Sequence, residues 1–206
     1  MKLYDLVSNT LNYIMLNLFR AIKKNKEAEC LNILQTENIQ IHMKDNEIPD
    51  ETKYIRNASP IVIASDVGNP RIVEALILKG ANVNDTNDNG LTSLMKASIY
   101  GNQDVIKLLL SHGVDIHKKS NNNCTAILYA SLHSEKEAVQ LLLSEGASIY
   151  DKTMHGSSCV DVTYNNEIKS IFENWPVTMI IIILQELSLN GDLLESNIND
   201  LQEYFV

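Results

Sequence analysis

Three stretches of the chain repeat one pattern at a fixed interval. They are GNPRIVEALILKGANVN (68–84), GNQDVIKLLLSHGVDIH (101–117) and SEKEAVQLLLSEGASIY (134–150), and they start 33 residues apart. Self-similarity at such a period is typical of solenoids, in which each unit is too small to bury its apolar face alone and stacks on its neighbours. The period therefore predicts an extended array of stacked repeats.

The charge balance limits the partners that such an array can take. The chain has 17 Lys and Arg against 26 Asp and Glu, a formal net charge of −9, and its acidic residues are scattered. Nucleic-acid binding needs a basic face that displaces counterions, and an anionic membrane attracts the same kind of face. We therefore expect neither nucleic acid nor a membrane as a partner.

The cysteines and the apolar segments favour an intracellular location. Cys30, Cys124 and Cys159 are odd in number and form no C-x-x-C motif, which is typical of free thiols in a reducing compartment. The N-terminal segment lacks the continuous apolar core of a signal peptide. The most apolar run, Met179–Leu184, is far shorter than the about 20 residues that span a bilayer. We expect a cytoplasmic protein, with the nucleus as an open alternative.

Each repeat is predicted to contain two short helices and an extended arm. In residues 87–119, Gly90 permits a tight turn before residues suited to cap a helix. Residues 94–98 then form a short first helix, and apolar residues within 105–110 recur at the spacing of a second helix. Residues 114–117 leave as an extended arm toward the next repeat.

This pattern resembles the ankyrin repeat, whose family form is approximately G-x-T-P-L-H-x-A-A-x-x-G-x-x-x-I-V-x-L-L-L-x-x-G-A-x-V-N. The residues that carry the resemblance include SPIVIAS (59–65), IVEALILKGANVN (72–84), GLTSLMKA (90–97) and TAILYA (125–130). Register, spacing and residue type agree three times over residues 57–152. The resemblance implies an all-α ankyrin solenoid of helix-turn-helix repeats with hairpin loops, and a protein-binding role without a cofactor.

The chain departs from the family pattern at a few positions. Asn123 and Ser134 stand where the family has glycine, and Ala126 stands where it has proline. The family histidine that follows the leucine is replaced in all three copies, by Val62, Met95 and Leu128. The buried hydrogen bonding that this histidine provides in the family is therefore an open question in this chain.

The pattern weakens toward both ends, as is expected for terminal repeats with one face in water. Upstream, residues 18–34 form a degenerate repeat whose turn residue is Asn25. The surplus of ten residues between Asn25 and the next repeat falls in the polar loop Asp45–Asn57. Downstream, Gly156 keeps the register, but we expect the second helix of that repeat, Glu167–Trp175, to be truncated.

Beyond Trp175 the repeat pattern stops. Apolar residues at helical spacing predict two amphipathic helices separated by Asn190-Gly191, which would form a helical C-terminal cap. The same pair is faintly similar to the F-box-like helices of some viral ankyrin proteins, which recruit ubiquitin-ligase adaptors. The expected organisation is an N-terminal capping region (1–56), ankyrin repeats (57–175) and a C-terminal helical hairpin (176–206).

The sequence contains no recognisable catalytic or metal-binding motif. The five histidines match no metal-ligand spacing, and glycine-rich phosphate loops and nucleophile motifs are absent. Cys124 and Cys159 hold nearly equivalent positions in successive repeats, so a metal or redox pair there is a minor alternative. We expect no catalytic, cofactor-binding or metal-binding residues, and we expect that the protein is not an enzyme.

The resemblance also predicts where a partner binds. Ankyrin proteins usually bind partners on the concave face, which is formed by hairpin tips and first helices. Several residues there are apolar although the fold does not demand it, which marks a contact surface unless neighbouring helices bury them. Lys118, Lys119 and Lys152 add a small basic spot. The predicted partner-binding residues are Val67, Asp88, Asn89, Leu91, Ile99, Tyr100, Lys119, Asn121, Leu132, His133, Met154 and His155.

The function expected from these observations is a non-catalytic scaffold, monomeric, that binds a partner protein through the concave face. The alternative is a two-headed adaptor whose C-terminal helices recruit a second partner such as ubiquitin-ligase machinery. The bias toward Ile and Asn also resembles ankyrin proteins of large DNA viruses. In that case the partner would be a host protein.

Overall fold

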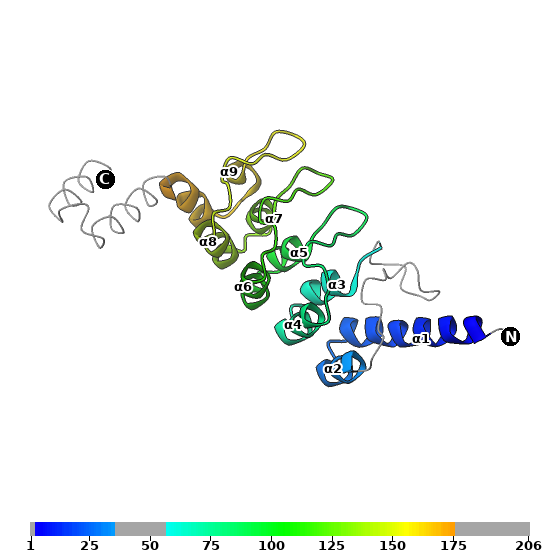
Figure 1. The fold of residues 1–206 in the computed structure, drawn as a ribbon. Helices are drawn as coiled ribbons and strands as arrows, with labels where there is room; N and C mark the ends of the chain where they lie inside the picture. The colour runs from blue at the N-terminus through cyan, green and yellow to red at the C-terminus, as the bar shows by residue number, and fades with distance from the viewer. Residues whose placement is uncertain (1–2, 36–56, 176–206) are drawn as a thin grey trace, which may run out of the picture.

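The chain forms two layers of antiparallel helices with hairpin loops projecting from one side (Figure 1). The computed structural model describes residues 3–35 and 57–175. The first helices of the repeats are α1 (Leu3–Lys23), α3 (Pro60–Val67), α5 (Ser93–Ile99), α7 (Ala126–Leu132) and α9 (Cys159–Val162). The second helices are α2 (Glu27–Gln35), α4 (Pro70–Leu78), α6 (Gln103–Ser111) and α8 (Lys136–Ser144), followed by a helix at residues 166–175.

The core lies between the two layers and is continuous along the array. First helices contact first helices in the order α1, α3, α5, α7 and α9, and α2, α4, α6 and α8 contact one another in the same way. The apolar positions of the repeat supply the buried side chains, such as Val105, Ile106 and Leu109 of α6. No repeat closes its core alone, so the all-α solenoid predicted from the 33-residue period is confirmed.

The turns of the repeat require a left-handed backbone conformation. Residues other than glycine also adopt this conformation where they occupy the turn. Asn57, Asn123 and Ser134 have positive φ values of 59°, 60° and 63°. Asn25 has a φ of 51° between α1 and α2, so it performs the same turn in the degenerate first repeat. Asparagine visits this region more readily than most residues because its short polar side chain bonds locally.

The predicted truncation of the last second helix is wrong. Residues 166–175 are helical over ten residues, whereas α4, α6 and α8 have nine each. The shortened element is the first helix of that repeat, α9, which has four residues and ends where Thr163 adopts an extended conformation. The Asn165 side chain then accepts from the backbone N–H of Glu167 and Ile168 and caps the next helix early.

Two predicted features fall outside the described residues. These are the inserted loop Asp45–Asn57, apart from Asn57 itself, and the C-terminal helical hairpin at 176–206 with its proposed adaptor role. The described core ends on Phe172, which is buried, and on Trp175, which is half-buried. The array is therefore described from the degenerate first repeat to the end of the shortened last one.

Candidate partner-binding surface

Three hairpins of the same design project from the helices. In each, a backbone N–H donates across the turn to a carbonyl four residues later: Asn87 to Leu91 at 3.1 Å, Ser120 to Cys124 at 3.0 Å, and Thr153 to Ser157 at 2.9 Å. We call residues 82–92, 115–125 and 148–158 the first, second and third tips. Their equivalent bonds follow from the repeated turn residue, which is glycine or asparagine.

Backbone hydrogen bonds also join each tip to the next. The N–H of Asn121 donates to the carbonyl of Asn89 at 3.0 Å, and the N–H of Met154 donates to the carbonyl of Asn122 at 2.9 Å. The Asn121 amide side chain adds a bond to the Asp88 carbonyl at 2.8 Å. The tips therefore form one continuous row, in which a side chain on one tip stands at a fixed position relative to the next.

The predicted partner-binding residues divide into two groups by exposure. The large apolar ones on the outside are Tyr100 (55% exposed), Leu132 (48%) and Met154 (60%). The exposed polar ones are Asp88, Lys119, Asn121, His133 and His155, and the half-buried ones are Val67, Asn89, Leu91 and Ile99. For the last group, neighbouring elements cover part of the side chain, and Leu91 packs against the core.

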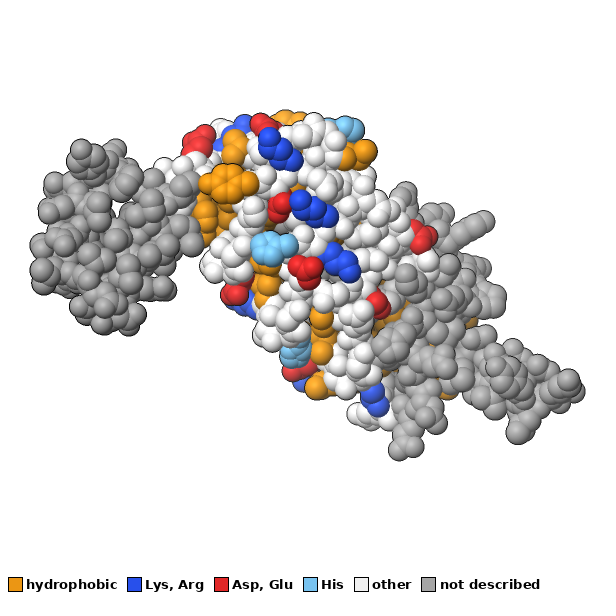
Figure 2. Space-filling model, turned by 45° about the horizontal axis from the view of Figure 1, so that its top comes forward, with side chains coloured by type: hydrophobic (Ala, Val, Ile, Leu, Met, Phe, Trp, Pro, Cys, Tyr) orange, Lys and Arg blue, Asp and Glu red, His pale blue; other side chains and the backbone are white. Residues whose placement is uncertain are grey.

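Ion pairs neutralise several charges on this side of the protein. Lys119 of the second tip pairs with Asp151 of the third at 2.9 Å, and Lys96 of α5 pairs with Asp66 of α3 at 2.8 Å. Both pairs bridge neighbouring repeats, and the partly buried Lys96–Asp66 pair is screened less by salt than an exposed pair would be. Figure 2 shows charges of both signs interspersed with hydrophobic side chains on the face that includes the tips.

Sequence reasoning missed three features of this surface. The Lys96–Asp66 pair was not predicted, although its partners lie 30 residues apart and the period places them on neighbouring first helices. Tyr129 is half-buried on α7 and shares a hydrogen bond with the Ser120 hydroxyl at 3.0 Å. Tyr164 is 89% exposed in the connection between the shortened α9 and the helix at 166–175, and this exposure could not be found while the shortening was assigned to the following helix.

The cysteines are buried and free. Burial raises the pKa of the Cys30 thiol to about 11 and that of Cys159 to about 12, and it also raises the pKa of Cys124. A thiol with a raised pKa stays protonated at neutral pH and is a weak nucleophile. Within residues 3–35 and 57–175, no group of three His, Cys, Asp or Glu side chains is placed to hold a metal ion.

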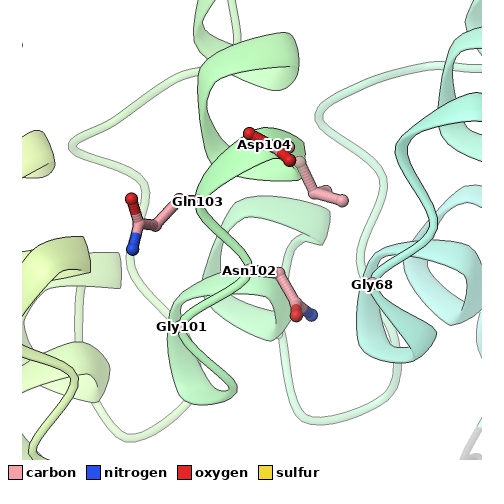
Figure 3. A pocket seen from close by; sticks show the side chains of 6 residues that line it. Gly68, Gly101, Asn102, Gln103 and Asp104 are labelled. Carbon is pink, nitrogen blue, oxygen red and sulfur yellow. The ribbon is translucent and has the colours of Figure 1, made fainter.

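One hollow opens on the side opposite the tips, where the second helices begin. It has a volume of about 370 Å³ and is lined by Gly68, Val105 and the start of α6 (Figure 3). The Asn102 side chain lies over Gly68 and donates to the Ser65 carbonyl at 3.2 Å, so it bridges two repeats. The position of the Asn102 side chain is explained by packing, because Gly68 leaves the space that the Asn102 amide fills.

In the described part of the chain, no helix is both long and apolar enough to cross a bilayer.

The comparison with protein families agrees with this architecture. The model for ankyrin repeats in three copies matches residues 18–120 and 61–153, which together cover more than half of the chain. The chain belongs to the ankyrin-repeat family. Ankyrin repeats are generally protein–protein interaction modules and are typically not enzymes. A search of curated proteins found no match to this chain.

Proposed function

We propose that the protein is a non-catalytic scaffold that binds one partner protein across the tips and the ends of the first helices. The observation that carries this proposal is the exposure of Tyr100, which directly follows α5, and of Leu132, the last residue of α7, at the ends of the first helices of consecutive repeats. Both side chains are about half exposed. Tyrosine is among the residues that supply most of the binding energy at protein interfaces, and exposed apolar side chains that lie together mark contact surfaces.

The rigidity of the tip row supports the same proposal. Because backbone hydrogen bonds fix each tip against the next, the surface is ordered before a partner arrives. A preorganised surface loses little conformational entropy on binding, so more of the contact energy appears as affinity. Met154 adds an exposed apolar side chain to the third tip.

The test is the double variant Tyr100→Ala/Leu132→Ala. We expect it to keep the circular dichroism spectrum and unfolding midpoint of the wild type, since both side chains are about half exposed. We expect it to bind the partner, identified by affinity capture and mass spectrometry in the cell that makes the protein, at least about tenfold more weakly.

The matched control is Leu78→Ala. Leu78 is 78% exposed at the end of α4, in the second-helix layer, where the next repeats have Ser111 and Ser144. The Leu78→Ala substitution removes an exposed leucine from the second-helix layer, away from the proposed binding face, so partner binding should be unchanged. Unchanged binding by the double variant, or equal loss in the control, would refute the assignment of this face.

A further inference from the structure

One position of the repeat faces the preceding repeat at the turn between the first and second helices. It is occupied by Asn69, Asn102 and Glu135, which stand 33 residues apart and directly precede α4, α6 and α8. The first two side chains are amides, which both donate and accept hydrogen bonds. The third is a carboxylate, which only accepts them when it is ionised.

The two asparagines bind the preceding repeat through their amide groups. The Asn69 amide donates to the side-chain oxygen of Asn25 at 2.8 Å. The Asn102 amide lies over Gly68 and donates to the Ser65 carbonyl at 3.2 Å (Figure 3). At both junctions, the protein itself supplies the donor and the acceptor.

Glu135 occupies the same place without such a bond. Its carboxylate lies over Gly101, because a Cβ at residue 101 would collide with Oε2 of Glu135 and stand 2.9 Å from Cδ. The carbonyl in the register of Ser65 is that of Ser98, and two acceptors cannot bond to each other. The Glu135 carboxylate also accepts no N–H group of α8, and it has no hydrogen-bond or ion-pair partner in the part of the chain that the structure describes.

The chain places no cation beside this carboxylate. Residues 97–106 and 126–135, which form the two sides of the junction, contain neither lysine nor arginine. Lys136 follows Glu135 directly, but its ammonium pairs with Glu167 of the last repeat at 2.6 Å. Glu135 is half-buried, so its charge is screened by salt less than that of an exposed carboxylate.

The contact between Glu135 and Gly101 joins the two segments that carry the proposed anchors. Gly101 directly follows Tyr100, and Glu135 comes three residues after Leu132. From this geometry we infer that the partner protein binds with a lysine or arginine side chain against the Glu135 carboxylate. The inference rests on the proposed function and adds a basic residue to the chemistry of the partner. A complementary charge at this place favours partners that carry it over those that do not.

The probe for this inference is a displayed library of random 12-residue peptides, selected on the immobilised wild-type protein. Enriched peptides that bind Tyr100→Ala more weakly are carried into double-mutant cycles. Each cycle combines Glu135→Gln on the protein with glutamine in place of one basic residue of the peptide. We expect one basic residue of each peptide to couple with Glu135→Gln by about threefold in Kd.

The matched control is Glu74→Gln. It removes an exposed carboxylate from α4 in the second-helix layer and changes the net charge by the same amount. The basic residue of the peptide should not couple with this variant. Coupling equal to that at Glu135 would show a long-range charge effect and would overturn the inference.

Thermal unfolding of Glu135→Gln is a second readout that needs no peptide. Glutamine has the length of glutamate, and its amide can donate to the Ser98 carbonyl as the Asn102 amide donates to that of Ser65. The unfolding midpoint should therefore equal that of the wild type or rise. A lower midpoint would show that the chain itself compensates the carboxylate, which would overturn the inference.

Other outcomes separate this inference from the proposed function. Peptides weakened by Tyr100→Ala but without a basic residue coupled to Glu135 would overturn the inference and leave the proposed function standing. A selection that yields no peptide weakened by Tyr100→Ala would overturn both. A wild-type dimer in sedimentation that Glu135→Gln dissociates would mean that a second copy of the chain supplies the basic side chain, which also overturns the inference.

Discussion

Thr92 and Thr125 hold the same position in consecutive repeats, but their hydroxyl groups differ in bonding. The Thr92 hydroxyl accepts from the N–H of Met95 at 3.1 Å and caps α5. The Thr125 hydroxyl is buried at the start of α7 and has no hydrogen-bond partner within the described part of the chain. Leu128 stands nearby where the family has histidine. The buried hydrogen bonding that this histidine provides in the family is therefore missing at Thr125.

The first prediction follows from this difference. Thr125→Val removes a hydroxyl that has no hydrogen-bond partner among the described residues, so the free energy of unfolding should stay within about 0.5 kcal/mol of the wild type or rise. Thr92→Val removes a working helix cap and should lower it by about 1 kcal/mol. Urea unfolding followed by circular dichroism measures both. Equal losses in the two variants would contradict the difference in bonding.

The second prediction concerns the glycines of the tips. Gly90 and Gly156 have φ values of 71° and 82°, so alanine is strained at both. A Cβ at residue 90 would also stand 2.9 Å from the backbone nitrogen of Asn121, whereas none of the described atoms lies within 4 Å of one at residue 156. Gly156→Ala should cost about 1 kcal/mol, and Gly90→Ala about 1–2 kcal/mol more because it pushes two tips apart. Thermal unfolding of the two variants side by side tests this order.

Ser134 gives a stabilising prediction. It has a φ of 63° at an exposed turn where the other clear repeats have Gly68 and Gly101. Ser134→Gly should raise the free energy of unfolding by about 0.5–1 kcal/mol, because glycine adopts this conformation without the Cβ clash. Gln140→Gly, at an exposed position inside α8, should lower it by about 1 kcal/mol. A destabilised Ser134→Gly protein would mean that the serine side chain contributes more than its backbone strain costs.

The fourth prediction is a loss of stability in alkaline solution. The pKa of Cys30 is about 11 and that of Cys159 about 12 in the folded protein, against about 8.5 for an unfolded thiol. The unfolded chain releases these thiol protons at a lower pH than the folded protein does. The two thiols therefore contribute fully to the free energy of unfolding below about pH 8.5, and this contribution declines as the pH rises toward 11. Unfolding free energies measured from pH 7 to 10.5 should fall, and the fall should be shallower in Cys159→Ala. A pH-independent difference between the two proteins would contradict the assignment.

The positions that could be predicted from the sequence are those that the period repeats. Gly90 and Asn123 make the same turn because the tip needs a positive φ at that register, and Ile106 and Leu109 are buried because the period places them on the face of α6 that packs against the core. These properties depend on the local backbone and on stacking in one direction. They are therefore visible in any one copy of the motif.

The features that could not be predicted depend on how neighbouring repeats are rotated and shifted against each other. The bond from Asn121 to Asn89 joins residues 32 positions apart, one short of the period, and its existence depends on the offset between tips. The pairing of Lys96 with Asp66 depends on side-chain direction in the same way. In the last repeat, Gly156 and the start of α9 stayed in register while the second helix, at 166–175, began early. The spacing before the turn therefore gave no sign that α9 would be short.

The bonded tip row restricts how a protein of this kind can change its partner. An added or deleted residue in the second tip would move Asn121 and Asn122 away from Asn89 and Met154 and would break the contacts on both sides at once. Changes of loop length are therefore penalised in the middle of the row, whereas substitutions of exposed side chains such as Asp88 leave the backbone bonds intact. New specificity in this array can thus arise by exchange of side chains on tips of constant length.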